Sequence, residues 1–202
     1  MLFKLIKIYR FDFLKIFLYE IFHIFAGFKG NSYKIRNDDR VTDNIPCPYF
    51  FLSKIKSFIK EKKIKTFIDL GCGSGRSIYF LNRKYKINYI GIEYFEENYT
   101  KCQKLFEKYE NVAIINNDFM KYDFLKLNAD CYFINDPLKN FDEFNELISK
   151  IINKSHELNK EIFFILVNLN KEKLKLFDKY KLLDSININT RGFYIYSNNL
   201  NK

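Results

Sequence analysis

Residues 67–76 read FIDLGCGSGR, and this stretch decides the fold. A short, mostly apolar run that ends in glycines is typical of a buried strand followed by a turn. Gly71 and Gly73 have no Cβ atom, so the backbone can turn sharply there and let a ligand approach closely. A helix that begins just after the turn would point its first amides at that ligand. The motif therefore predicts a strand, a ligand-binding turn and a helix in succession.

Apolar patterns alternate between strand and helix along most of the chain. We expect helices at residues 50–63, 75–85, 95–109, 141–158 and 171–180. We expect strands at residues 66–70, 87–93, 112–116, 130–135 and 161–168. Strands that alternate with helices need crossover connections, and these predict a parallel sheet with helices on both faces.

The C-terminal end breaks this alternation. Residues 181–188 and 193–197 read as two strands, and only residues 189–192 join them. A parallel crossover needs about a dozen residues or more, so these strands must form an antiparallel hairpin. The sequence thus predicts an α/β fold with about five strands in parallel units and then a hairpin.

The glycine spacing separates two kinds of nucleotide-binding turn. A dinucleotide fingerprint needs glycine three positions after Gly73, where this chain has Arg76. The spacing here is GxGxG, and Asp69 stands two positions before the first glycine. With the terminal hairpin, this combination closely resembles class I S-adenosylmethionine-dependent methyltransferases. The resemblance covers about residues 45–200. It implies a doubly wound, mainly parallel seven-stranded sheet and S-adenosylmethionine as the cofactor.

The same resemblance implies cofactor-binding roles around this turn. Gly71 and Gly73 would line the methionine part of the cofactor, with Cys72 between them in the same set. Asp69 would lie near the amino end of that part. Glu93 ends the second predicted strand, where a carboxylate can accept hydrogen bonds from both hydroxyls of a ribose. We therefore expect the amino acid and the ribose of the cofactor to bind at this turn.

Three more residues complete the predicted cofactor site. Asp118 and Phe119 follow the third predicted strand, where the family often has an acid that binds the adenine amino group and then a residue near the ring. The alternative for Asp118 is an ordinary loop or helix cap, which Asp also favours. Tyr49 follows Pro46 and Pro48 ahead of the first strand. Similar segments of the family often close over the cofactor, which implies a cofactor-side role for Tyr49.

Asn135 and Asp136 end the fourth predicted strand, which faces the transferred methyl group in this family. Amino-group methyltransferases often carry Asp or Asn here, then two prolines and an aromatic residue. This chain keeps Asp136 and Pro137 but has Leu138 and Lys139 in the last two places, which argues against a nucleobase substrate. Asn135 or Asp136 could still orient or deprotonate an acceptor, and both are candidate catalytic residues. A simple junction between strand and turn is the alternative.

The basic residues are concentrated in the N-terminal third. Residues 1–65 contain 14 Lys and Arg against 6 Asp and Glu, which accounts for +8 of the net charge of +10. Such a segment can attract the phosphates of nucleic acid or anionic lipid. A solvated, lysine-rich surface is the simpler interpretation.

Residues 12–25 predict an amphipathic helix. Its polar side holds Asp12, Lys15, Glu20 and His23, and its apolar side holds Phe13, Leu14, Phe17, Leu18, Ile21, Phe22 and Phe25. The apolar side either lies on a membrane surface or packs on the main domain or a partner, which is the commoner case. Charged residues interrupt any run of the length that a membrane span needs. We expect residues 1–44 to form a basic helical extension and residues 45–202 to form the methyltransferase domain, with membrane contact through residues 1–30 left open.

Composition limits the chemistry further. Four cysteines without CxxC spacing and only two histidines do not predict a metal site, and reduced thiols suit a cytoplasmic protein. The segment after the fourth strand is too short for a separate substrate domain. We therefore expect methyl transfer to a protein side chain or a small molecule. A nucleic-acid methyltransferase, and a non-catalytic membrane- or partner-binding module on the same fold, are the alternatives.

Overall fold

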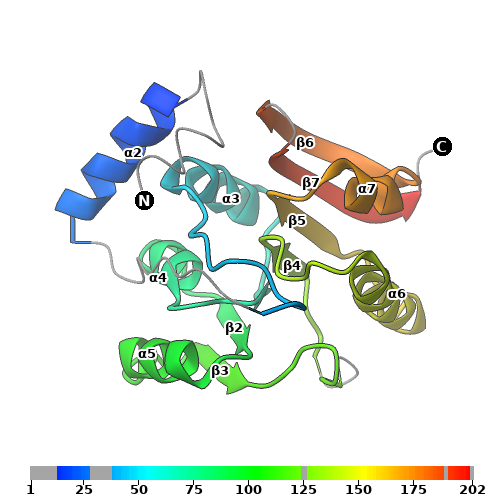
Figure 1. The fold of residues 1–202 in the computed structure, drawn as a ribbon, viewed down its shortest axis with the longest axis horizontal. Helices are drawn as coiled ribbons and strands as arrows, with labels where there is room; N and C mark the ends of the chain where they lie inside the picture. The colour runs from blue at the N-terminus through cyan, green and yellow to red at the C-terminus, as the bar shows by residue number, and fades with distance from the viewer. Residues whose placement is uncertain (1–12, 28–37, 124–126, 189–190, 201–202) are drawn as a thin grey trace.

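A seven-stranded sheet lies at the centre of the computed structural model, which describes residues 13–27, 38–123, 127–188 and 191–200 (Figure 1). The strands are β1 (Thr66–Leu70), β2 (Asn88–Glu93), β3 (Val112–Asn116), β4 (Cys131–Ile134), β5 (Phe163–Val167), β6 (Tyr180–Ile188) and β7 (Arg191–Leu200). Their order in the sheet is β3-β2-β1-β4-β5-β7-β6. Strands β1 to β5 are parallel, whereas β7 is antiparallel to both β5 and β6. The predicted mainly parallel sheet with a C-terminal hairpin is confirmed.

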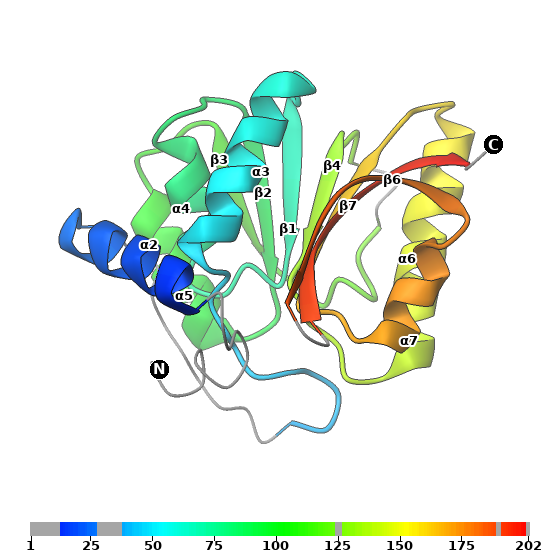
Figure 2. The same cartoon turned by 90° about the horizontal axis from the view of Figure 1, so that it is seen from above.

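Helices cover both faces of the sheet (Figure 2). They are α2 (Phe13–Phe25), α3 (Tyr49–Glu61), α4 (Arg76–Asn82), α5 (Glu96–Phe106), α6 (Phe141–Glu157), α7 (Lys171–Leu174) and the 3-10 helix η3 (Lys175–Phe177). Side chains of α3, α4 and α5 share one buried cluster, and those of α6 and η3 share the other. The fold is therefore doubly wound, as the alternating pattern predicts.

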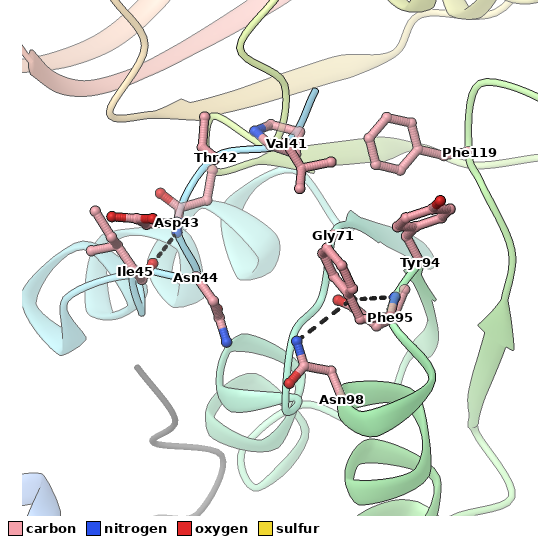
Figure 3. A pocket seen from close by; sticks show the side chains of 13 residues that line it. Val41, Thr42, Asp43, Asn44, Ile45, Gly71, Tyr94, Phe95, Asn98 and Phe119 are labelled. Carbon is pink, nitrogen blue, oxygen red and sulfur yellow. Dashed lines mark hydrogen bonds between the residues drawn. The ribbon is translucent and has the colours of Figure 1, made fainter. Parts of the chain in front are cut away.

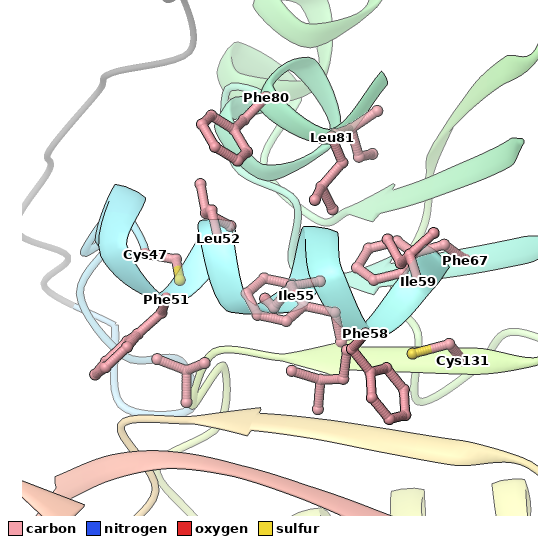
Figure 4. Packing of buried hydrophobic residues seen from close by; sticks show 14 of the residues in the cluster. Cys47, Phe51, Leu52, Ile55, Phe58, Ile59, Phe67, Phe80, Leu81 and Cys131 are labelled. Atoms are coloured by element: carbon pink, nitrogen blue, oxygen red, sulfur yellow. The ribbon is translucent and has the colours of Figure 1, made fainter. Parts of the chain in front are cut away.

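Strand β1 supplies both hydrophobic clusters because successive strand residues point to opposite faces. Phe67 packs with α3, whereas Ile68 packs on the α6 side. Figure 4 shows the buried face of α3, with Ile55 and Ile59 turned toward the sheet next to Phe67. Each such side chain contributes roughly 1.5–3 kcal/mol on full burial. This packing holds the carboxyl end of β1, and with it the glycine-rich turn, in a fixed place.

The last two strands extend beyond their predicted limits. β7 covers Arg191–Leu200 rather than residues 193–197, and β6 begins at Tyr180. The reason is that the added residues of β7 pair with β6, since Arg191, Gly192 and Leu200 lie opposite Ile188, Asn187 and Tyr180, whereas β5 pairs with residues 193–197 alone. Pairing with β6 thus brings Arg191 and Gly192, which the sequence pattern places in the connection, into β7. The predicted helix at residues 171–180 is correspondingly shorter, since α7 passes into η3 and ends at Phe177.

Helix α2 packs against α3, as the commoner interpretation of the N-terminal pattern expects, but it does so with an unexpected face. Ile16 and Glu20 are buried, whereas Leu18, Phe22 and Phe25 are 57%, 68% and 87% exposed. Glu20, which the helical pattern places on the polar side, is therefore turned toward the domain. The reason is that the Glu20 carboxylate finds charged and polar partners inside the domain, which offset the cost of its burial. Asp12 lies outside the described residues.

Among the helices that the structure describes, none is both long enough and apolar enough to cross a membrane.

Candidate cofactor site

The glycine-rich turn joins β1 to α4 and forms a cradle. Gly71 and Gly73 have φ angles of +84° and +57°, which side chains with a Cβ rarely adopt. A Cβ on Gly71 would lie 3.3 Å from the Cβ of Pro137, and one on Gly73 would lie 3.0 Å from Oδ1 of Asn44. The Gly71 amide donates to the carbonyl of Ile92 at 2.9 Å, which ties the turn to the end of β2. Glycine is thus needed at both places to keep the cradle open.

Two small cavities, of about 60 and 30 Å³, lie beside this cradle. They share four lining residues, Asn44, Ile45, Gly71 and Asn135. The larger cavity, shown in Figure 3, also has Glu93 and Phe119 in its wall, and the smaller one has Asp69 and Arg76. The two cavities thus adjoin at these shared residues, with Glu93 in the lining of one and Asp69 in the lining of the other.

Glu93 is buried at the end of β2 and binds backbone amides. Its Oε2 accepts from the amide of Gly73 at 2.8 Å, and its Oε1 accepts from the amide of Phe95 at 2.9 Å. Asn98 donates to Oε1 at 3.5 Å, and Figure 3 draws the bonds at Phe95 and Asn98. Glu93 thereby links the glycine-rich turn and the start of α5 to the end of β2.

Asp69 lines the smaller cavity, where it is buried and accepts a hydrogen bond from the hydroxyl of Ser77. Burial raises the pKa of Asp69, the bond from Ser77 lowers it, and the nearby charge of Glu93 raises it, which places the pKa at about 7. Asp69 therefore changes charge near neutral pH. Sequence reasoning did not identify Ser77, which lies eight residues away on α4.

We expect the raised pKa of Asp69 to make the protein less stable as pH rises from about 5 to 7. The folded state keeps the Asp69 proton up to about pH 7, whereas the unfolded chain releases it near pH 4. Stability from this group is thus present at acid pH and declines by up to about 1.4 kcal/mol for each pH unit until the folded pKa is passed. Urea unfolding of the wild type and of Asp69→Asn from pH 5 to 8 checks this. The stability difference between the two should change across that range, and parallel curves would contradict the prediction.

A segment of residues 38–48, here called the strap, lies across both cavities. Val41 forms a β-bridge with Leu138, and the amide of Thr42 donates to the carbonyl of Pro137 at 3.2 Å. Strap residues line each cavity. Clefts that bind drug-sized ligands are about 300–1,000 Å³, so a nucleoside-sized ligand needs the strap to shift.

Arg40 links the strap to Asp118 and Glu143. Its Nη1 and Nη2 bind the two carboxylate oxygens of Asp118 at 2.7 and 2.9 Å, and its Nε donates to Glu143 at 3.0 Å. Burial alone would raise the pKa of Asp118, but the bonds from Arg40 and from the Met120 amide hold it below the usual value. The structure thus places Asp118 in an ion pair. Its contact with adenine stays a prediction, and sequence reasoning missed Arg40.

The two candidate catalytic residues have different surroundings. Asp136 forms an ion pair at 2.5 Å with the buried Nζ of Lys173, which ties its carboxylate to α7. Asn135 lines both cavities and donates from Nδ2 to the carbonyl of Ile45 at 2.7 Å. Its Oδ1 accepts from Asn168 at 2.9 Å, which fixes the orientation of the amide. The geometry therefore favours Asn135 over Asp136 as the side chain that meets an acceptor.

Cys72 and Tyr49 lie at the edge of the site. Cys72 lines the smaller cavity, and its Sγ is 3.9 Å from that of Cys102. Its contact with Cys102 and its burial raise the pKa of the Cys72 thiol. Tyr49 is completely buried, and the guanidinium carbon of Arg76 lies 3.8 Å from the centre of its ring. Tyr49 is not in the lining of these two cavities, so it reaches the site through Arg76.

Within the described part of the chain, no group of three or more His, Cys, Asp or Glu residues is placed to hold a metal ion.

Comparison with known proteins agrees with this geometry. Residues 67–155 match the family model of methyltransferase domains. An RNA methyltransferase from Salinibacter ruber, solved with S-adenosyl-L-homocysteine, is 13% identical with a TM-score of 0.59 over 77% of this chain and 94% of that one. The methyltransferase PaMTH1 of Podospora anserina, also bound to S-adenosyl-L-homocysteine, is 16% identical with a TM-score of 0.57 over 78% and 80%.

Mitomycin 7-O-methyltransferase MmcR is also similar, with 12% identity and a TM-score of 0.53 over 74% of this chain and 54% of that one. No curated protein matches the sequence. At these identities the solved structures establish the fold, and the family model identifies the domain. The chain therefore has the fold of the class I S-adenosylmethionine-dependent methyltransferases, and its residues 67–155 match the methyltransferase domain.

Proposed function

We propose that this protein transfers a methyl group from S-adenosylmethionine to a protein side chain or a small molecule. The observation that carries the proposal is the open cradle at Gly71 and Gly73, with Glu93 on one side and Asp69 on the other. The family match supports the cofactor class. The two relatives with bound S-adenosyl-L-homocysteine support it as well, since that molecule is the cofactor without its methyl group.

The residues of the site fit an elongated amino acid–nucleoside. Glycine at the turn leaves space beside the backbone for the methionine part. The Asp69 carboxylate suits an ammonium group, and the Glu93 carboxylate suits two ribose hydroxyls. Phe119 is buried in the wall of the larger cavity, where its ring can pack against adenine.

The chain's own residues serve mainly to bind and align the reactants. The cofactor supplies an already activated methyl group when it is bound, and transfer needs the acceptor in line with it at close range. Asn135 is held by Asn168 and Ile45, so its amide presents a fixed hydrogen-bonding group toward the cavities. Strap residues line both cavities and would limit the access of water to them. In this assignment Asn135 orients the acceptor atom, and proton removal does not depend on Asp136.

The acceptor class follows from the end of β4. Leu138 is completely buried, and the Lys139 amide donates to the carbonyl of Arg40 in the strap. Neither side chain contains an aromatic ring that could lie beside a planar base. This arrangement supports a protein side chain or a small molecule over a nucleobase. The basic N-terminal third supports the nucleic-acid alternative, and a strong loss of binding with added salt would favour it.

The proposal is tested by calorimetric titration of the full chain with S-adenosylmethionine. We expect the wild type to bind and Glu93→Gln to lose at least about tenfold in affinity, because a buried hydrogen-bond partner of the ligand is lost. The matched control is Glu97→Gln, an exposed acid on α5 whose pair with Lys101 contributes little. Thermal unfolding of each variant checks that the turn remains folded. A folded wild type that fails to bind at high cofactor concentration would refute the enzyme and favour a non-catalytic module.

A further inference from the structure

Arg76 is a buried cation at the start of α4, directly after the glycine-rich turn. Its Nη2 forms an ion pair with Glu20 of α2, and its guanidinium stacks on the ring of Tyr49. Its Nε is also buried and has no hydrogen-bond partner among the described residues. A buried charged donor without a partner is costly, so this N–H points to a group that the free protein does not supply.

Arg76 lines the smaller cavity, which Asp69 also lines. A cation and an acid therefore border one cavity of about 30 Å³, whose lining does not include Phe119. An α-amino acid carries an ammonium and a carboxylate on one carbon atom. The two side chains match these two charges in sign, and arginine is well suited to carboxylates.

The ion pair with Glu20 supports this interpretation in two ways. The pair shows that the buried Arg76 guanidinium binds a carboxylate. Glu20 also uses its other oxygen, Oε1, to accept from the amide of Tyr49 at 2.8 Å, so it is fixed by α3 as well. Arginine has five N–H donors on three nitrogen atoms, and Glu20 binds Arg76 at Nη2. The guanidinium thus keeps capacity for a second carboxylate.

We propose that Arg76 binds the α-carboxylate of the methionine part of the cofactor, while Asp69 binds the ammonium on the same carbon. The inference rests on the proposed function and names a residue that the family resemblance does not assign. It makes Arg76 responsible for discrimination between ligands with and without a carboxylate. Glu20 and Tyr49 then act as positioning residues, because they hold the guanidinium in place.

The test compares two ligands that differ only in the carboxylate. Calorimetric titration of the full chain with S-adenosylmethionine and with its decarboxylated form gives a ratio of affinities. We expect the wild type to prefer the carboxylate form by about 10- to 100-fold, as charge-assisted hydrogen bonds do. The double variant Glu20→Gln/Arg76→Gln removes both charges of the buried pair and should bring the ratio close to one. Arg83→Gln, at the exposed C-terminal end of α4, is the matched control and should keep the wild-type ratio.

The outcomes separate the two proposals. If the wild type binds both ligands equally well, or the double variant keeps the wild-type ratio, Arg76 does not bind the carboxylate although the cofactor does bind. If the wild type binds neither ligand, the proposed function fails and this inference with it. Arg76→Lys retains the charge but not the fork, and it should lower the ratio without removing it. If the double variant does not fold, the affinity ratios of the wild type and of Arg76→Lys test the proposal.

Discussion

Gly71→Arg is expected to abolish binding of S-adenosylmethionine, with a loss of affinity of at least about 100-fold. Gly71 lies in the wall that both cavities share, and its φ of +84° is unfavourable for any side chain. An added Cβ would already be 3.3 Å from Pro137, so the rest of the arginine must extend along the cradle. Calorimetric titration of the purified variant measures the loss.

The control for this variant is Gly27→Arg. Gly27 follows α2, has a similar φ of +72°, and has no atom within 4 Å of the place where a Cβ would be. The two variants share the added charge and the strained backbone, but only Gly71→Arg fills the cradle. Gly27→Arg should bind the cofactor as the wild type does. Equal affinities in the two variants, with both folded by circular dichroism, would contradict the assignment of the cradle.

Lys173→Met is expected to lower the free energy of unfolding by about 3–5 kcal/mol, because removal of one partner leaves a buried charge uncompensated. Lys173 is 2% exposed, and its Nζ donates to the Asp136 carboxylate and to the Leu138 carbonyl. Asp136 has a φ of +42°, so the pair also holds a strained residue in place. Urea unfolding monitored by circular dichroism measures the change.

Lys171→Met provides the comparison for that measurement. Lys171 is exposed at the first residue of the same short helix, and its replacement should change stability by no more than about 0.5 kcal/mol. In the Lys173→Met background, Asp136→Asn should recover part of the loss, because it removes the unpaired charge and Asn tolerates a positive φ. Equal stabilities for the two lysine variants would mean that the ion pair does not hold the end of β4.

Local pattern was sufficient to predict most of the fold. Val112–Asn116 is found as a strand with the predicted limits, and α6 begins at Phe141 as expected. These elements could be predicted because the periodicity of their apolar residues is a property of the segment itself. The longer β7 could not, since its added residues pair with β6, a partner strand that the segment itself does not specify.

The site was predictable in part for the same reason. Asp69 follows from the resemblance of its motif to that of the class I methyltransferases and Glu93 from its place at a strand end, and both border the cavities. The side chains that form ion pairs with the charged residues around the site lie far away in sequence. Arg76 meets Glu20 from 56 residues away, and Arg40 meets Asp118 from 78 residues away. Burial of the Glu20 carboxylate is offset by its pair with Arg76, and the helical pattern of α2, which places Glu20 on the polar side, does not contain that distant partner.

The pair between Arg40 and Asp118 has a consequence for the timing of binding. For any ligand that lies beneath the strap, only molecules with the strap displaced are competent to receive it, and the observed affinity is reduced by that fraction. The same displacement precedes departure, so its frequency sets an upper limit on ligand exchange, whatever the speed of the chemistry. The bidentate contact between Arg40 and Asp118 would thus govern how long a ligand stays bound, although it lies outside the reacting groups.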